Sequence, residues 1–230
     1  MHAPPGRVVC FGEAMLRNSG DLESPGGSEY NVACALARLG VSATWVSALP
    51  HDSSIIDQIA LDSGVHLDVR RSGHAVGSYT VDQEAGTVVY ERSNSAFAHL
   101  EPSEFDWRGT LTGARWLVMS GITPLLGEGP RSAWGGALTF AELDGTLIAM
   151  DLNYRPALGT IEELWNLVRP RMRMFHVLVL SPESLASIAE IEGLDIPTTY
   201  EENIEALAEL RRRFLIPHLC CTFKRPETDG

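Results

Sequence analysis

Short apolar runs alternate along this chain with segments whose apolar residues recur at helical spacing. The run Arg7–Phe11 stops at a glycine and a glutamate, which is typical of a buried strand that ends in a loop. Because strand and helix patterns alternate, we expect parallel pairing in an α/β sheet. Further strands are predicted at 43–49, 116–119, 146–150, 175–180 and 218–223, and helices around 28–40, 55–64, 134–141, 164–168, 185–189 and 204–208.

The stretch from Val69 to Arg92 breaks this rhythm. Two β-prone runs, 77–81 and 87–92, flank the glycine-containing segment 83–86, a pattern that predicts a β-hairpin. A hairpin inserted into a parallel α/β pattern often serves as a lid. Its polar and aromatic side chains could face a ligand, or they could form a solvent-facing strand surface; they are Tyr79, Tyr90 and Arg92.

A glycine pair, Gly26 and Gly27, opens the first predicted helix, and Gly40 stands where a helix can end in a left-handed residue. Glycines let the backbone approach a ligand, and the first helical turn presents unpaired N–H groups beside the carboxamide of Asn31. This arrangement suits sugar hydroxyls, but an ordinary turn before a core helix has the same pattern. The residues expected to face the core are Val32, Leu36 and Leu39.

Composition narrows the function classes. With 230 residues and 44% hydrophobic content, the chain can bury the core of one large domain. The 30 acidic against 18 basic residues argue against a nucleic-acid surface, so an anionic ligand would need local positive groups. No signal peptide or membrane-length apolar run is apparent, which predicts a soluble cytoplasmic protein. The cysteines lack CxxC spacing and are expected to be buried thiols: Cys10, Cys34, Cys220 and Cys221.

Polar residues follow several of the predicted strands: Glu13, Ser120, the segment 151–155 and Ser181. In an open parallel sheet the ligand crevice lies outside the carboxyl ends of the strands. We therefore expect these residues to contribute to one site. The histidines show no metal-ligand spacing and no GxSxG motif occurs, so neither a metal centre nor serine hydrolysis is indicated.

The motif Asp151-x-Asn153-x-Arg155-Pro156 is the most informative of these. A loop that ends in proline is rigid, and the Arg155 guanidinium can bind a carboxylate or phosphate through two parallel hydrogen bonds. The alternative is that Asp151 and Arg155 simply pair with each other or with neighbours at the sheet edge.

The segment from Gly26 to Gly40 resembles the N-terminal signature of the ribokinase-like (PfkB) carbohydrate kinases. The likeness runs from about Val8 to Lys224. Shorter motifs are more particularly similar to 2-keto-3-deoxygluconate kinases: Gly12-Glu13, Gly77-Ser78-Tyr79, Tyr90-x-Arg92, Ser120-Gly121-Ile122-Thr123-Pro124 and Asp151-x-Asn153-Tyr154-Arg155.

The resemblance implies ATP-dependent phosphorylation of a small sugar or sugar acid. It implies a doubly wound, mainly parallel sheet flanked by helices, with a small β lid formed around 13–25 and 76–93, through which the protein could form a homodimer. Mg²⁺ would bridge phosphate oxygens during the transfer. The matching substrate-binding residues are Glu13, Gly27, Asn31, Tyr79, Tyr90, Arg92 and Arg155, and those on the nucleotide side are Asn153, Ser181 and Lys224.

Three departures from the family pattern bear on function. The second family signature, a Gly-Ala-Gly-Asp stretch that supplies the catalytic base, does not occur before Gly230, so no catalytic residue is assigned. Ser184 stands where many members have a glutamate of the Mg²⁺–phosphate network. The run between Glu13 and Gly26 leaves little room for a pair of lid strands.

We therefore expect residues 1–230 to form an incomplete, C-terminally truncated PfkB-type domain that holds the substrate-binding half. As written, such a chain should be nearly inactive. The alternatives are a non-catalytic sugar-binding protein or pseudo-kinase, and, with a poorer match to Arg155, a nucleoside kinase.

Overall fold

The computed structural model describes residues 6–19, 22–82 and 87–223. It contains a seven-stranded sheet flanked by helices and a separate four-stranded sheet. Each pairing in the larger sheet with a defined register is parallel, which confirms the predicted α/β fold class. The chain divides into two compact units, residues 1–148 and 149–230, with the boundary inside one strand, β9 (Leu147–Asp151).

In the first unit, β1 (Arg7–Phe11) lies between β8 (Ala114–Ser120) and β4 (Ala43–Pro50). A further strand, β5 (His66–Ser72), pairs with β4 at the edge. The sequence pattern did not predict β5, because its polar and charged residues (HLDVRRS) conceal a strand that is only partly buried. The apolar strands β1 and β4 are almost fully buried, as expected for the centre of a parallel sheet.

The described residues of the first unit form four α-helices: α1 (Ser28–Arg38), α2 (Ser54–Asp62), α3 (Trp107–Leu111) and α4 (Glu128–Asp144). Short 3₁₀ turns occur at Pro102–Glu104 and Thr123–Leu125. Helices α1, α2 and α4 confirm predicted helices. The five-residue α3 was not predicted, since one helical turn carries too little periodicity to detect.

The predicted core face of α1 is only partly correct, because Leu36 packs against the core but Val32 and Leu39 face solvent. Val32 is 36% exposed and Leu39 is 79% exposed. The helix instead buries Tyr30, whose ring packs edge-on against Trp45 at a centroid distance of 5.0 Å and whose hydroxyl donates to the Ile56 carbonyl at 2.9 Å. Because these contacts fix the rotation of the helix, the small residues beside Tyr30 face the core, and two of the larger apolar ones face solvent.

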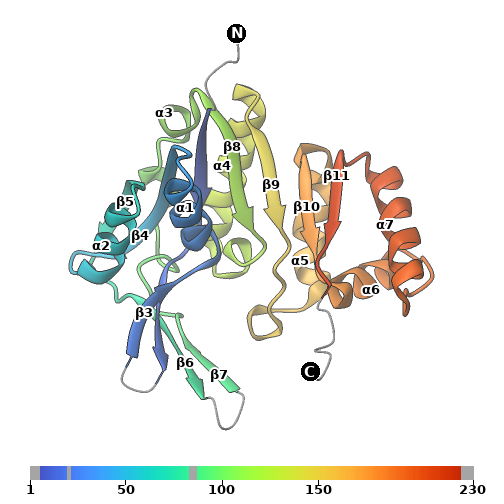
Figure 1. The fold of residues 1–230 in the computed structure, drawn as a ribbon, viewed down its shortest axis with the longest axis horizontal. Helices are drawn as coiled ribbons and strands as arrows, with labels where there is room; N and C mark the ends of the chain where they lie inside the picture. The colour runs from blue at the N-terminus through green and yellow to red at the C-terminus, as the bar shows by residue number, and fades with distance from the viewer. Residues whose placement is uncertain (1–5, 20–21, 83–86, 224–230) are drawn as a thin grey trace. The chain divides into compact units, whose positions relative to one another are not determined.

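The four-stranded sheet has the order β3-β2-β6-β7 and lies beyond the carboxyl end of β1 (Figure 1). Its strands are β2 (Met15–Ser19), β3 (Leu22–Gly26), β6 (Gly77–Asp82) and β7 (Thr87–Glu91). The expectation that residues 13–26 leave too little room for two strands is therefore wrong, because two five-residue strands, β2 and β3, pair there in antiparallel fashion. The hairpin of β6 and β7 was predicted, and its loop 83–86 lies outside the described residues.

The second unit contains β9, β10 (Val177–Leu180) and β11 (His218–Cys221), in the order β11-β10-β9. Its helices are α5 (Ile161–Val168), α6 (Pro182–Ile191) and α7 (Tyr200–Phe214), with 3₁₀ turns at Pro156–Leu158 and Arg169–Met174. Thr160 and Thr199 begin α5 and α7 with reciprocal capping boxes, which satisfy backbone donors at both helix starts.

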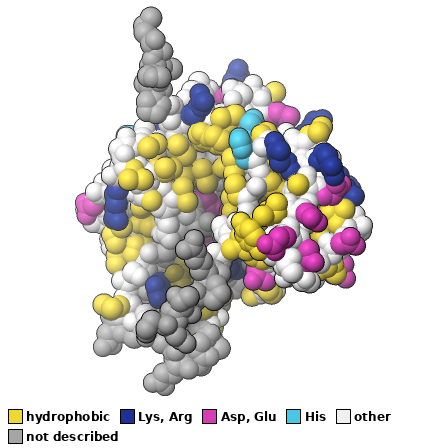
Figure 2. Space-filling view, turned by 45° about the vertical axis from the view of Figure 1, so that its right-hand side comes forward, with side chains coloured by type: hydrophobic (Ala, Val, Ile, Leu, Met, Phe, Trp, Pro, Cys, Tyr) yellow, Lys and Arg dark blue, Asp and Glu magenta, His cyan; other side chains and the backbone are white. Residues whose placement is uncertain are grey.

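Surface charge, helix length and the cysteines complete the description. On the face shown in Figure 2, Lys and Arg side chains are interspersed with acidic ones. No helix within the described ranges is long and apolar enough to cross a membrane. The expectation that the cysteines are all buried holds for Cys10 and Cys34, but Cys220 is exposed and Cys221 half-buried, because both lie on the edge strand β11.

Candidate functional site

A buried ion pair joins the end of β1 to the segment that follows the hairpin. The side chain of Glu13 is only 3% exposed and that of Arg92 11%. The Arg92 Nε donates to Glu13 Oε2 at 2.9 Å, and its Nη2 donates to the same oxygen. The structure thus brings two predicted substrate-binding residues together, and it does so by pairing them with each other.

Ser95 is a third member of this cluster, and the sequence analysis missed it. Its hydroxyl donates to Glu13 Oε1 at 2.5 Å and accepts the Ala98 N–H at 3.1 Å, and the residue is 2% exposed. Both carboxylate oxygens of Glu13 are therefore hydrogen-bonded, as a buried carboxylate requires. The only hint in the sequence is a serine shortly after the hairpin, which says nothing of a contact 82 residues away.

Glycines make room for this cluster. A Cβ atom on Gly77 would lie 2.8 Å from Glu13 Oε1, and one on Gly27 would collide with the Glu13 backbone carbonyl. Gly27 also has a φ of 152°, which L side chains rarely adopt. The diglycine turn and the start of β6 can therefore approach Glu13 only because both positions lack a side chain.

The two predicted lid tyrosines are cross-strand partners. Tyr79 in β6 is paired with Tyr90 in β7, and their ring centroids are 5.7 Å apart. Tyr90 is 42% exposed, and a Cβ on Gly26 would lie 2.7 Å from the Tyr79 hydroxyl. Arg92 lies one residue beyond the end of β7, so its ion pair with Glu13 anchors the chain directly after the strand that carries Tyr90.

Asn31 is exposed in the first turn of α1. It lines a cavity of about 400 Å³ together with Ser24, Arg38 and Ile59. The residues of the Glu13 cluster and the two tyrosines do not line this cavity. The structure thus places Gly27 against Glu13, but it does not bring Asn31 into the same cavity, so the role of Asn31 stays a prediction.

In the second unit, the loop after β9 carries the motif of residues 151–155. Asp151 Oδ1 accepts the Asn153 N–H at 3.0 Å, and Asn153 takes a positive φ of 43°. Burial raises the pKa of Asp151, against the opposing effects of the Asn153 N–H and of the nearby Arg155 charge. Arg155 itself is exposed and forms no ion pair with another described residue. The described loop therefore contains no direct ion pair between Asp151 and Arg155, which was the alternative drawn from the sequence.

Ser181 follows β10 and caps α6. Its hydroxyl accepts the Ser184 N–H at 3.2 Å and also contacts the Ser184 hydroxyl at 3.2 Å. Ser181 therefore has a clear structural role, and its assignment to the nucleotide stays a prediction. Lys224, also assigned there, lies outside the described residues.

The described side chains do not form a metal site of their own. Within the described ranges there is no group of three or more His, Cys, Asp or Glu residues placed to hold a metal ion. Ser184 is buried at the position where an acidic residue would be needed. No chemical step is therefore assigned here to a metal ion held by the described side chains.

With this geometry established, three comparisons with known proteins are informative. The family model described as "pfkB family carbohydrate kinase" matches residues 4–211 of the chain. The chain belongs to this family. Its fold is accordingly the α/β fold with a second small sheet that the carbohydrate kinases of this family share, and the resemblance drawn from the sequence motifs is confirmed.

Individual relatives point to similar enzymes. The chain is 33% identical over 214 residues to a 2-dehydro-3-deoxygalactonokinase of Haloferax volcanii. The match covers 85% of this chain and 66% of the relative. It is 31% identical over 140 residues to a 5-dehydro-2-deoxygluconokinase of Shouchella clausii, and this match covers 57% of this chain and 42% of the relative. The crystal structure of a 2-dehydro-3-deoxygluconokinase from Thermotoga maritima superposes with a TM-score of 0.84 at 32% identity. The superposition covers 94% of this chain and 70% of that chain. The chain thus spans less than two thirds of the length of these curated relatives.

Proposed function

We propose that this member of the pfkB family contributes the substrate-binding part of an ATP-dependent kinase for a small sugar acid resembling 2-keto-3-deoxygluconate. The observation that carries the proposal is the anchored aromatic hairpin. Arg92 and Ser95, which follow β7, bind Glu13 at the end of β1. We propose that this anchor holds Tyr79 and Tyr90 beside the ligand, at the carboxyl ends of the strands where α/β proteins bind ligands.

The preference for an acidic sugar rests on Arg155. Its guanidinium is exposed and forms no ion pair with another described residue, so it is available to an anionic ligand. In a chain with a net charge of −12, such a local positive group is needed to hold a carboxylate. The relatives described above are dehydro-deoxy sugar kinases, which agrees with this substrate class.

Carbohydrate kinases of this family use ATP and a divalent metal ion. We propose that ATP with Mg²⁺ also serves here, with Asn153, Ser181 and Lys224 on the nucleotide side. Bound ATP would supply the phosphoryl group, and the residues of this chain would bind and orient the sugar acid. We assign the catalytic base to none of them, since the Gly-Ala-Gly-Asp stretch does not occur in this sequence.

We further propose a cytoplasmic location and a homodimer formed through the four-stranded sheet. The described cysteines are free thiols, which suits a reducing compartment. The sheet has open edges at β3 and β7 and exposes large apolar side chains. These are Leu22 at 77%, Val88 at 44% and Val89 at 60%. A second copy of the chain would cover such an edge and remove its unpaired backbone groups from solvent.

Ligand binding to the purified chain tests the substrate class. We expect 2-keto-3-deoxygluconate to raise the melting temperature, and we expect fructose and adenosine to have much smaller effects. Arg155→Ala should weaken binding of the sugar acid by about tenfold or more, because a charge-assisted pair is lost. The matched control is Arg173→Ala, which removes another exposed arginine of the same unit. Equal binding by wild type and Arg155→Ala, measured by titration calorimetry, would refute the role of Arg155.

A further inference from the structure

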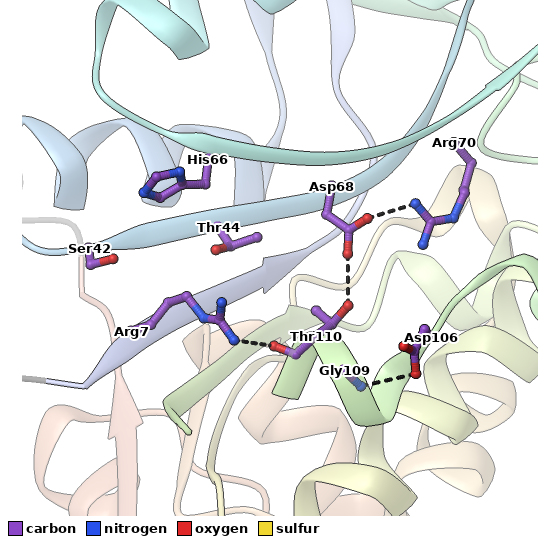
Figure 3. Close-up of a pocket in the computed structure, with 9 residues that line it drawn as sticks. All are labelled: Arg7, Ser42, Thr44, His66, Asp68, Arg70, Asp106, Gly109 and Thr110. Atoms are coloured by element: carbon purple, nitrogen blue, oxygen red, sulfur yellow. Dashed lines mark hydrogen bonds and ion pairs between the residues drawn. The ribbon is translucent and has the colours of Figure 1, made fainter. Parts of the chain in front are cut away.

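A second polar pocket lies in the first unit, at the amino ends of β1, β4 and β5 (Figure 3). Its volume is about 510 Å³, within the range of roughly 300–1,000 Å³ that is typical of small-molecule sites. Backbone segments from three strands and from α3 form its walls. The residues that matter for its chemistry are Arg7, Ser42, Thr44, His66, Asp68 and Thr110.

This pocket and the Glu13 cluster lie at opposite ends of β1. Arg7 begins the strand and Glu13 follows its end. At about 3.3 Å per residue, the six steps between them correspond to roughly 20 Å. A ligand in this pocket would therefore not contact Glu13, and the inference below does not rest on the proposed kinase function.

The carboxylates in the pocket are already engaged. Asp68 Oδ1 accepts from Arg70 Nη1 at 2.7 Å, and Asp68 Oδ2 accepts from the Thr110 hydroxyl at 2.7 Å. Asp106 accepts the Gly109 N–H at 3.0 Å, at the start of α3. Both oxygens of Asp68 and the Oδ1 of Asp106 thus already have hydrogen-bond donors within the protein.

Arg7 supplies the most prominent of these donors. Its Nη2 donates to the carbonyls of Thr110 at 2.7 Å and Thr112 at 3.3 Å, which hold the guanidinium in place. Its Nε is buried and has no hydrogen-bond partner among the described residues. In Figure 3 the guanidinium lies between Thr110 and Thr44. A buried donor without a protein acceptor is unfavourable, so an acceptor from a ligand would stabilise the guanidinium at this place.

We propose that this pocket binds a small oxyanion, the phosphate or carboxylate group of a metabolite. Arg7 would be its anchor, through the Nε–H that has no partner among the described residues and through the charge of the guanidinium. The hydroxyls of Ser42 and Thr44 and the imidazole of His66, which line the same pocket, supply further donors. A prearranged arginine is what an acidic protein needs to hold an anion against its overall negative charge.

The competing explanation is that Arg7 only satisfies the carbonyls at the end of α3. In that case added anions would leave its guanidinium unchanged. Nitrogen-15 NMR of the arginine Nε–H groups in the purified full chain separates the two explanations, and Arg7→Lys identifies the Arg7 signal by its loss. Inorganic phosphate and acetate are titrated to about 10 mM at constant ionic strength, with chloride as the reference anion.

We expect a saturable shift of the Arg7 Nε–H signal with phosphate or acetate and none with chloride. The anion that binds more tightly identifies the head group. Ser42→Asp places a carboxylate at the pocket and leaves the Arg7 contacts intact, so it should weaken binding by about tenfold or more. Ser132→Asp, an exposed serine on α4, should bind like wild type. The absence of a saturable shift, or equal binding by wild type and Ser42→Asp, would overturn the proposal.

Discussion

Glu13 lies after β1, as predicted, but its carboxylate is hydrogen-bonded within the protein. Its position after β1 marked it as part of a site, and the structure places it in a cluster at the carboxyl end of the sheet. Yet its carboxylate is not open to a ligand, because Arg92 binds one oxygen and Ser95 the other. Removing either partner would leave a buried charge with fewer hydrogen bonds, which is costly.

The first residue-scale prediction concerns Ser95→Ala. Loss of its hydroxyl leaves Glu13 Oε1 without its 2.5 Å donor, so we expect the free energy of unfolding to fall by about 1–3 kcal/mol. Urea denaturation followed by circular dichroism measures this. Ser93→Ala, at an exposed serine two residues earlier, should change stability by less than about 0.5 kcal/mol. Equal stability of Ser95→Ala and wild type would show that the contact is not structurally important.

The second residue-scale prediction concerns Asp151. Because burial raises its pKa in the folded state, the folded protein binds this proton more tightly than the unfolded chain does. The stability that protonation provides is present at low pH and is lost as the pH rises from the ordinary value of 3.8 through the raised folded pKa. At pH 7, Asp151→Asn should therefore be more stable than wild type, and the difference should shrink on acidification.

Urea unfolding of Asp151→Asn at neutral and acidic pH tests this, with exposed Asp195→Asn as the control for loss of one negative charge. A less stable Asp151→Asn at pH 7 would mean that Arg155 and the Asn153 N–H outweigh burial.

At the scale of elements, the predictable features were those with a strong local pattern. The strands β1 and β4 read as apolar runs, and the hairpin of β6 and β7 was marked by its alternation and its glycine-containing loop. The region of β2 and β3 was assigned to the lid only through the family resemblance, since its local pattern is polar and β2 pairs with β6, which is far away in sequence. The rotation of α1 could not be predicted either, since it is set by the contact of Tyr30 with Trp45.

The diglycine turn gives the element-scale prediction. Gly27 has a φ of 152°, and a Cβ there would collide with the Glu13 carbonyl. We expect Gly27→Ala to lower the free energy of unfolding by more than about 2 kcal/mol, from backbone strain and the collision together. Gly145→Ala is the matched control, because Gly145 has a φ of 68° but open space around it, so only the cost of about 1–2 kcal/mol for a left-handed residue applies.

Urea unfolding of the two glycine variants separates strain from collision. If both lose the same stability, the close approach of the turn to Glu13 contributes nothing. If Gly27→Ala loses more, the absence of a side chain is needed to bring the turn against the end of β1. That result would explain physically why a glycine pair precedes this helix.

At the scale of the whole molecule, the motifs predicted the family correctly, but they predicted only part of the contacts around the candidate site. The motifs placed Glu13, Arg92, Tyr79 and Tyr90 in one half of the chain, where the structure joins them in pairs. The contact of Ser95 with Glu13 and the pocket at Arg7 were not predicted, because both are formed by residues that are far apart in sequence and carry no motif. The relation of Asn31 and Arg155, which belong to different units, stays a prediction that ligand binding must test.

The last prediction concerns assembly. If the four-stranded sheet forms a homodimer, then Val89→Asp should shift the protein toward monomer, because a carboxylate would replace a 60% exposed apolar side chain of the edge strand β7. Val89 points to the opposite side of β7 from Tyr90, so the variant leaves the proposed ligand face unchanged. Leu143→Asp adds the same charge at a 74% exposed leucine on α4 and should sediment like wild type. A wild-type protein that is monomeric at every concentration in sedimentation equilibrium, or a Val89→Asp variant that stays dimeric, would exclude this interface.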